Sequence, residues 1–321
     1  MERPRRVALS LGAGGARGYA HIGVLQVLQE RGFEVVGIAA ASMGALVGGL
    51  HAAGRLGDYA DWVVTLTQMQ VVRMLNVSRG SGGALRADRV LARVNELLDG
   101  VAIESLPIPY TAVATDLFAR RPVWFQRGPL DVAVRASIAI PGMFSPVVVD
   151  GRVLVDGGLM DPMPVTPIAA IPCDLTVAVS LTGERNPHAA VAPAAEDGLM
   201  DAWAARIRRG TSTLLENELL RSVVGRLGAE PEPGPGGESA EDAQGEALPP
   251  GLRGFDVMTL SLEAMQAVIA RYQLASYPPD VHITISRDAC RSIDFHRGAE
   301  MIELGRVTTE AALDEAGLVT A

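Results

Sequence analysis

The chain has 321 residues, of which 48% are hydrophobic and 20% charged, a composition typical of a soluble globular protein with one large domain or two ordinary ones. Its net charge is −9, most of it from six acidic residues between positions 230 and 246, so the charge balance gives no reason to expect a nucleic-acid partner. All 28 basic residues are arginine, which excludes a P-loop lysine, a Schiff-base lysine and a Ser-Lys dyad.

The first half of the chain predicts alternating strands and helices. Apolar runs at 7–11 and 33–40 are expected to be strands, followed by helices that end at Gly32 and near Ala53. Both runs are apolar at successive positions, as in a parallel sheet that is covered on both faces. The uncharged stretch 35–54 is rich in Gly and Ala, so we interpret it as strand, turn and helix and not as a membrane span.

Further along, the pattern is mostly helical over 59–98, with an interruption, SRGSGG, at 78–83. A hairpin is predicted around Asp150-Gly151, which places Asp156 at the end of a strand. The other expected elements are strands at 110–115, 122–125, 175–181 and 281–285, and helices at 130–140, 260–272 and 297–316.

These elements predict an α/β fold, a three-layer α/β/α sandwich with a mostly parallel central sheet. We expect a catalytic core at 1–182 and a helix-strand-helix segment at 256–321 that completes the same domain. Between them, 183–255 is predicted to be an insertion, helical in its first part. Its second part, 229–251, holds five prolines, five glycines and six acids and is expected to be disordered.

Cysteine and histidine usage argues against a metal site. Cys173 and Cys290 lie far apart and are expected to be free thiols, and the five histidines show no zinc-binding spacing. We therefore expect no metal and no cofactor. The N-terminus does not resemble a signal peptide, so we predict a cytoplasmic protein that is at most peripheral to the inner membrane face.

Two small-residue turns carry the chemistry. GAGGARG, at Gly12 to Gly18, precedes a helix and offers backbone N–H groups to an anion or a developing oxyanion. In AASMG, at 40–44, Ser42 has small residues two before and two after it, which permits a sharp turn that raises a nucleophile; the alternative is a helix-capping serine. The first turn also resembles a dinucleotide fingerprint, but the second strand ends without the carboxylate that would hold a ribose. A turn that serves packing alone remains the other alternative.

A serine nucleophile needs a base. We prefer Asp156, which the adjacent Gly157 and Gly158 leave accessible at a strand end. A Ser, Asp, His order that ends in His282 or His296 is conceivable, but only two strands precede the serine, unlike the α/β-hydrolases. We assign both histidines, and His21 behind the first turn, structural roles.

Four ordered blocks, LSLGAGGARGYAHIGVL, ASMGALVGGL, RASIAIPGMFSPV and DGRVLVDGGLMDPMPV, resemble the bacterial patatin-like phospholipase family. The resemblance implies a Ser-Asp dyad that hydrolyses acyl esters, with Ser42 as nucleophile and Asp156 as base. It places the oxyanion hole at Gly14, Gly15 and Ala16, with Arg17 nearby, and gives Gly12, Gly18, Gly44, Gly157 and Gly158 supporting roles. Two positions depart from the family's pattern, Ala13 and Ala40, where glycine is usual.

The expected function is therefore hydrolysis of lipid acyl esters through an acyl-enzyme. The alternatives are a carboxylesterase or thioesterase on non-membrane acyl substrates, and a non-catalytic scaffold that binds a partner through 183–255. An acyl lipid or ester is the expected partner. One apolar cluster is interpreted either as core or as a lipid contact; it consists of Leu66, Met69, Val71, Val72, Met74 and Leu75.

Overall fold

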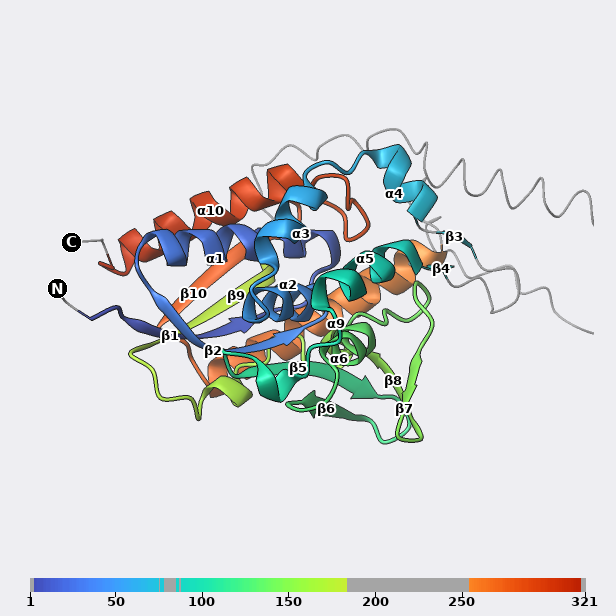
Figure 1. Cartoon of the computed structure of the whole chain (residues 1–321), viewed down its shortest axis with the longest axis horizontal. Coiled ribbons are helices and arrows are strands. Elements are labelled where there is room, and N and C mark those ends of the chain that lie inside the picture. The colour runs from blue at the N-terminus through green and yellow to red at the C-terminus, as the bar shows by residue number, and fades with distance from the viewer. Residues whose placement is uncertain (1–2, 75, 78–84, 87, 184–253, 319–321) are drawn as a thin grey trace, which may run out of the picture. The chain divides into compact units, whose positions relative to one another are not determined.

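A computed structural model describes residues 3–74, 76–77, 85–86, 88–183 and 254–318 (Figure 1). Nearly all of them belong to one compact unit, made of Met1–His188 and Met258–Ala321. The predicted interruption at 78–83 lies outside these ranges. So does the predicted insertion, apart from its first residue, Gly183, and its last two, at 254–255.

An eight-stranded sheet forms the centre of the described structure. In spatial order the strands are β10 (Val281–Ser286), β9 (Leu175–Gly183), β1 (Arg6–Leu11), β2 (Glu34–Ala41), β5 (Tyr110–Asp116), β8 (Arg152–Asp156) and β7 (Val147–Val149), with β6 (Arg121–Phe125) paired to β5. The strands from β10 to β5 are parallel, whereas β6, β7 and β8 pair antiparallel. A separate two-stranded ladder joins β3 (Asn76–Val77) to β4 (Leu85–Arg86).

Helices cover both faces of the sheet (Figure 1). Alternate residues of β1 point to opposite sides: Leu9 packs in the main core with the helices of one layer, whereas Ala8 meets the segment around Ile168. The first layer includes α1 (Ala20–Glu30), α2 (Met43–Ala52), α3 (Leu56–Val63), α5 (Asp88–Leu98), α6 (Leu130–Ser137) and α10 (Gly298–Glu315). On the other face, α9 (Gly254–Ser276) packs its Ala270 against Ala178 of β9. The predicted α/β/α sandwich is confirmed.

The helices differ from the sequence prediction at their ends. The helix expected to reach position 140 ends at Ser137, since the residue before Pro141 is disfavoured in the helical region. The second half of the Gly-rich turn forms part of a 3₁₀ turn, Gly15–Tyr19, which leads directly into α1. The stretch 35–54 lies in β2 and α2, and none of the helices in the described ranges is long and apolar enough to cross a bilayer.

The hairpin of β7 and β8 turns at Asp150 and Gly151, both at positive φ of 49° and 73°, as the sequence predicts. It returns β8 to β5, where Asp156 pairs with Ala114, the neighbour of Val113, which pairs with Ala41 of β2. Because β6 occupies the opposite edge of β5 at both positions, β2 and β8 share one edge and run toward each other. The carboxyl ends of these two strands therefore meet.

Ala40 is one of the two positions at which the sequence departs from the pattern of the family that it resembles. Its side chain is fully buried in the main core cluster, between β1 and β5. We predict that Ala40→Gly lowers the free energy of unfolding by about 1 to 2 kcal/mol, because it removes a buried methyl group and frees the unfolded backbone. Urea denaturation measures this change, and an increase in stability would show that the methyl group strains the strand.

Candidate active site

Ser42 lies on a sharp turn between β2 and α2. Its φ of 56° is unusual for a residue other than glycine, and it forms the N-cap of α2. The Ser42 N–H donates to Ser137 Oγ at 2.9 Å, and this hydroxyl donates to the carbonyl of Val113 at 2.6 Å. Ser137 therefore ties the strained turn to β5. Sequence reasoning missed this role, although Ser137 lies in one of the four quoted blocks.

Asp156 faces this serine directly. Ser42 Oγ donates to Asp156 Oδ2 at 2.6 Å, and the Gly158 N–H donates to Oδ1 at 2.7 Å. Both side chains are only 3% exposed. Burial raises the pKa of Asp156 from 3.8 to about 7, against the lowering effect of the two hydrogen bonds. A carboxylate with this pKa accepts a proton far more readily than an exposed aspartate does.

In the Gly-rich turn, two backbone amides that donate hydrogen bonds to described residues flank two that do not. Ala13 N–H donates to the carbonyl of Pro162, and Ala16 N–H donates to the carbonyl of Ser292, both at 2.9 Å. Within the described residues, the amides of Gly14 and Gly15 donate to nothing. Ala16, expected to contribute to an oxyanion hole, has its amide engaged. The candidate donors are therefore Gly14 and Gly15.

The glycines of the motifs permit close approach between these segments. A Cβ on Gly18 would collide with the side chain of Met43, and one on Gly44 with the carbonyl of Leu11. The two turns are thus in direct contact. Three further glycines lie where a side chain would clash: Gly12 against Met163, Gly157 against Val113, and Gly158 against Ala13.

Arg17 does not project into the space around Ser42. Its side chain is 3% exposed, and its guanidinium donates to the carbonyls of Gly14 and Arg287 and to the side chains of Glu263 and Ser292. The position of this arginine indicates a role within the turn. A charge that attracts a substrate would need to be accessible.

His21 and His282 lie beside groups other than Asp156. His21 Nε2 lies 2.9 Å from the carbonyl of Gly12, and burial lowers its pKa to about 4, so the ring is neutral and donates to that carbonyl. His282 lies beside Thr284 on β10. Within the described residues, the carboxylate of Asp156 is bonded by Ser42 and Gly158, with no histidine.

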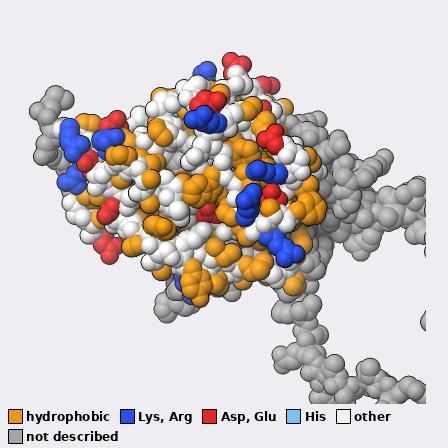
Figure 2. Space-filling view, turned by 90° about the horizontal axis from the view of Figure 1, so that it is seen from below, with side chains coloured by type: hydrophobic (Ala, Val, Ile, Leu, Met, Phe, Trp, Pro, Cys, Tyr) orange, Lys and Arg blue, Asp and Glu red, His pale blue; other side chains and the backbone are white. Residues whose placement is uncertain are grey.

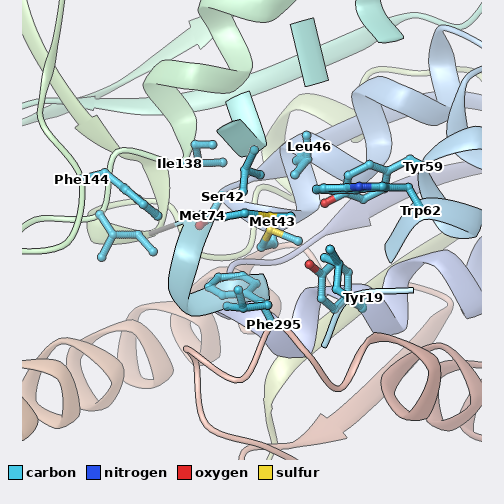
Figure 3. Close-up of a pocket in the computed structure, with 14 residues that line it drawn as sticks. Tyr19, Ser42, Met43, Leu46, Tyr59, Trp62, Met74, Ile138, Phe144 and Phe295 are labelled. Carbon is cyan, nitrogen blue, oxygen red and sulfur yellow. The ribbon is translucent and has the colours of Figure 1, made fainter. Parts of the chain in front are cut away.

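A pocket opens at Ser42, with about 630 Å³ of empty space including open solvent (Figure 3). Apart from Ser42, the described residues that line it are aromatic or aliphatic: Tyr19, Met43, Leu46, Tyr59, Trp62, Leu66, Val71, Met74, Val90, Ile138, Ile140, Phe144 and Phe295. The serine hydroxyl therefore lies in the wall of a pocket that suits a substrate with an apolar group next to its reacting atom.

A family model described as patatin-like phospholipase matches residues 9–169. An NTE family protein of Mycobacterium bovis, described as uncharacterized, is 48% identical over 332 aligned positions, which cover 96% of this chain and 91% of that protein.

Two other matches are more distant. Lysophospholipase NTE1 of Cryptococcus neoformans is 33% identical over 173 positions, which cover 51% of this chain and 10% of that protein. Among solved structures, VipD from Legionella pneumophila has a TM-score of 0.44 at 15% identity and covers 98% of this chain and 67% of that chain, a likeness too weak to bear on the site.

The raised pKa of Asp156 predicts a stability effect. The folded state binds this proton more tightly than the unfolded chain, so stability is lost as pH rises from about 4 through about 7. We expect Asp156→Asn to raise the unfolding temperature at pH 8, by an amount worth at most about 4 kcal/mol, and to do so much less at pH 5.

Asp174→Asn is the matched control. The pKa of Asp174 is lowered mainly by the hydrogen bond from the Arg6 N–H and, to a smaller extent, by the Arg3 side chain. Loss of the Asp174 carboxylate should therefore reduce stability at pH 8. Thermal unfolding at both pH values measures the difference. Equal destabilisation by Asp156→Asn at both values would contradict the effect of burial.

Proposed function

Because the chain belongs to the patatin-like phospholipase family, we propose that it hydrolyses acyl esters of lipids, with Ser42 as nucleophile and Asp156 as general base. The observation that carries the proposal is the hydrogen bond of 2.6 Å from Ser42 Oγ to Asp156 Oδ2 at the wall of an apolar pocket. Nucleophile and base are within direct proton-transfer distance, as a two-residue mechanism requires.

In the first half of the reaction, Asp156 accepts the proton of Ser42 as Oγ attacks the ester carbonyl. The C–O bond of the leaving alcohol then breaks, and the alcohol takes the proton from Asp156. The acyl group remains on Ser42 as an ester. Because Ser42 is held at positive φ and its amide is bonded to Ser137, its hydroxyl has little freedom to turn away from the base.

In the second half, Asp156 accepts a proton from water, which attacks the acyl-enzyme and releases the fatty acid. The serine leaves as an alcohol and regains its proton. Both tetrahedral intermediates carry a negative oxygen, for which the amides of Gly14 and Gly15 are the proposed donors. Each such donor is typically worth about 3 kcal/mol of barrier lowering.

The pocket supports a long acyl chain as the part of the substrate nearest the serine. An alkyl chain bound against these aromatic and aliphatic side chains is removed from water. This burial favours binding by about 0.8 kcal/mol for each CH₂. No charged side chain is among the described residues that line it. A polar head group therefore belongs outside the pocket, toward solvent.

The central test compares hydrolysis by the wild type, Ser42→Ala and Asp156→Asn. Lysophospholipids, diacyl phospholipid vesicles, acyl thioesters and p-nitrophenyl esters serve as the substrate panel. We expect Ser42→Ala to lower kcat/KM by at least about a thousandfold and Asp156→Asn by at least about a hundredfold. The wild-type value should rise with pH and level off above about 7, as Asp156 ionises.

The panel also separates the alternatives. A preference for thioesters or soluble esters over every lipid would favour a carboxylesterase or thioesterase. Hydrolysis that persists in Ser42→Ala would overturn the assignment of Ser42 as nucleophile. The absence of hydrolysis from the wild type on all substrates would overturn the proposed function and favour a scaffold.

A lipid substrate also requires contact with a lipid surface, for which we propose α4 (Gln68–Met74). Its Val71 and Met74 line the pocket, whereas Met69 is 63% exposed and Val72 39% exposed. The predicted apolar cluster is thus divided: Leu66 also lines the pocket, and Leu75 lies outside the described residues. An apolar surface continuous with the acyl pocket would let a chain pass from the lipid to Ser42.

We predict that the double variant Met69→Ser, Val72→Ser lowers hydrolysis of vesicle lipids about tenfold or more and leaves soluble p-nitrophenyl esters unchanged. The control is Val148→Ser, 70% exposed on β7. On the face seen in Figure 2, apolar side chains are scattered among charged ones. Vesicle assays with both variants decide the location. A loss in Val148→Ser but not in the double variant would move the contact to the β7 face.

A further inference from the structure

The Gly-rich turn is held by residues from the far end of the chain. Arg17 belongs to this turn, and its Nη2 donates to Glu263 Oε1 at 2.7 Å and to Ser292 Oγ at 3.1 Å. Ser292 also donates its hydroxyl proton to Glu263, so the three side chains form a closed triangle. Glu263 is on α9, and Ser292 is on the loop after β10.

This triangle is connected to the backbone of the turn at two points. Arg17 Nε donates to the carbonyl of Gly14 at 3.3 Å, and the Ala16 N–H donates to the carbonyl of Ser292 at 2.9 Å. The described chain has no cis peptide bond, and in a trans peptide C=O and N–H point to opposite sides. The bond to the Gly14 carbonyl therefore directs the Gly15 N–H away from Arg17.

The turn would not hold this shape unaided. Gly15 is at a positive φ of 58°, which glycine adopts freely, along with many alternatives. A Cβ on Gly15 would clash with Ser292, so the loop after β10 packs directly against the turn. Contacts from outside the turn must therefore select one orientation of the Gly14-Gly15 peptide.

The charge of Glu263 compensates that of Arg17. The guanidinium is 3% exposed and the Glu263 side chain 22% exposed, so the ion pair is largely withdrawn from water. Removal of the carboxylate would leave a buried cation with only neutral partners, a costly arrangement that favours movement of Arg17 toward water. Such a movement would release the Gly14 carbonyl.

We propose that Glu263 and Ser292 are positioning residues for ester hydrolysis, which fix the amide of Gly15 through Arg17. The inference rests on the proposed function of this amide as an oxyanion donor. It differs from the resemblance to the family, whose motifs include Arg17 but neither of its two partners. Catalysis would thereby depend on the correct seating of α9 and of the loop after β10.

The test uses Glu263→Gln, which keeps the size of the side chain and removes its charge, and Ser292→Ala, which keeps the backbone carbonyl. Glu30→Gln is the matched control, since Glu30 pairs with Arg306 and joins α1 to α10 away from Ser42. Glu263→Asp tests for partial rescue by a retained charge.

The first measurement is kinetic. We expect Glu263→Gln to lower kcat by about tenfold to a hundredfold, less than full loss of one oxyanion donor, with KM within about twofold. Ser292→Ala should show a smaller loss, Glu263→Asp an intermediate one, and Glu30→Gln none. A loss that appears in KM alone, or equally in Glu30→Gln, would overturn the proposal.

The second measurement does not depend on activity. Hydrogen exchange of a peptide that covers residues 12–19, in the Ser42→Ala background, should become about tenfold faster on adding Glu263→Gln and stay the same on adding Glu30→Gln. Unchanged exchange would show that Glu263 does not hold the turn. If the wild type hydrolyses no ester, the proposed function fails, and exchange alone decides whether the triangle holds the turn.

Discussion

Strands β2 and β8 approach each other along one edge of β5, and their ends meet at the adjacent residues Val113 and Ala114. This constraint of pairing brings Ser42, which follows β2, to Asp156, which ends β8, although 114 positions separate them in the chain. It needs β8 to run antiparallel in a sheet whose other half is parallel, and the tight hairpin at Asp150-Gly151 supplies that reversal. The Ser–Asp contact is thus a consequence of sheet topology.

The same arrangement sets the electrostatics of the site. A carboxyl group at the end of an inner strand is removed from water, which raises the pKa of Asp156 to about 7. A carboxylate in this position is destabilised when it is ionised, and the folded protein tolerates it because the hydroxyl of Ser42 and the amide of Gly158 bond both of its oxygens. Stability and reactivity are therefore opposed at this position, as they often are at active sites. The side chains that line the pocket beside Ser42 are apolar as well.

Most of the described fold was predictable from the sequence, because most strands of the central sheet are short apolar runs with a glycine or proline near one end. The turn at Ser42 and the strand end at Asp156 were predictable for the same reason. What local pattern could not show are contacts from distant segments: the Ser292 carbonyl that engages the Ala16 amide, the Glu263 carboxylate beside Arg17, and the Ser137 hydroxyl under the elbow. These depend on how α9, the loop after β10 and α6 pack, which no spacing in the chain encodes.

If Asp156 activates Ser42, the effect is visible in the rate at which a fluorophosphonate labels the protein, followed by intact-protein mass spectrometry across pH. The reagent phosphonylates an activated serine without requiring the natural substrate. We expect a single adduct on Ser42 whose rate of formation rises with pH and levels off above about 7. Asp156→Asn should label slowly and without that pH dependence. Labelling at equal rates in both proteins, or wild-type labelling that does not change between acidic and alkaline pH, would show that Asp156 does not activate Ser42.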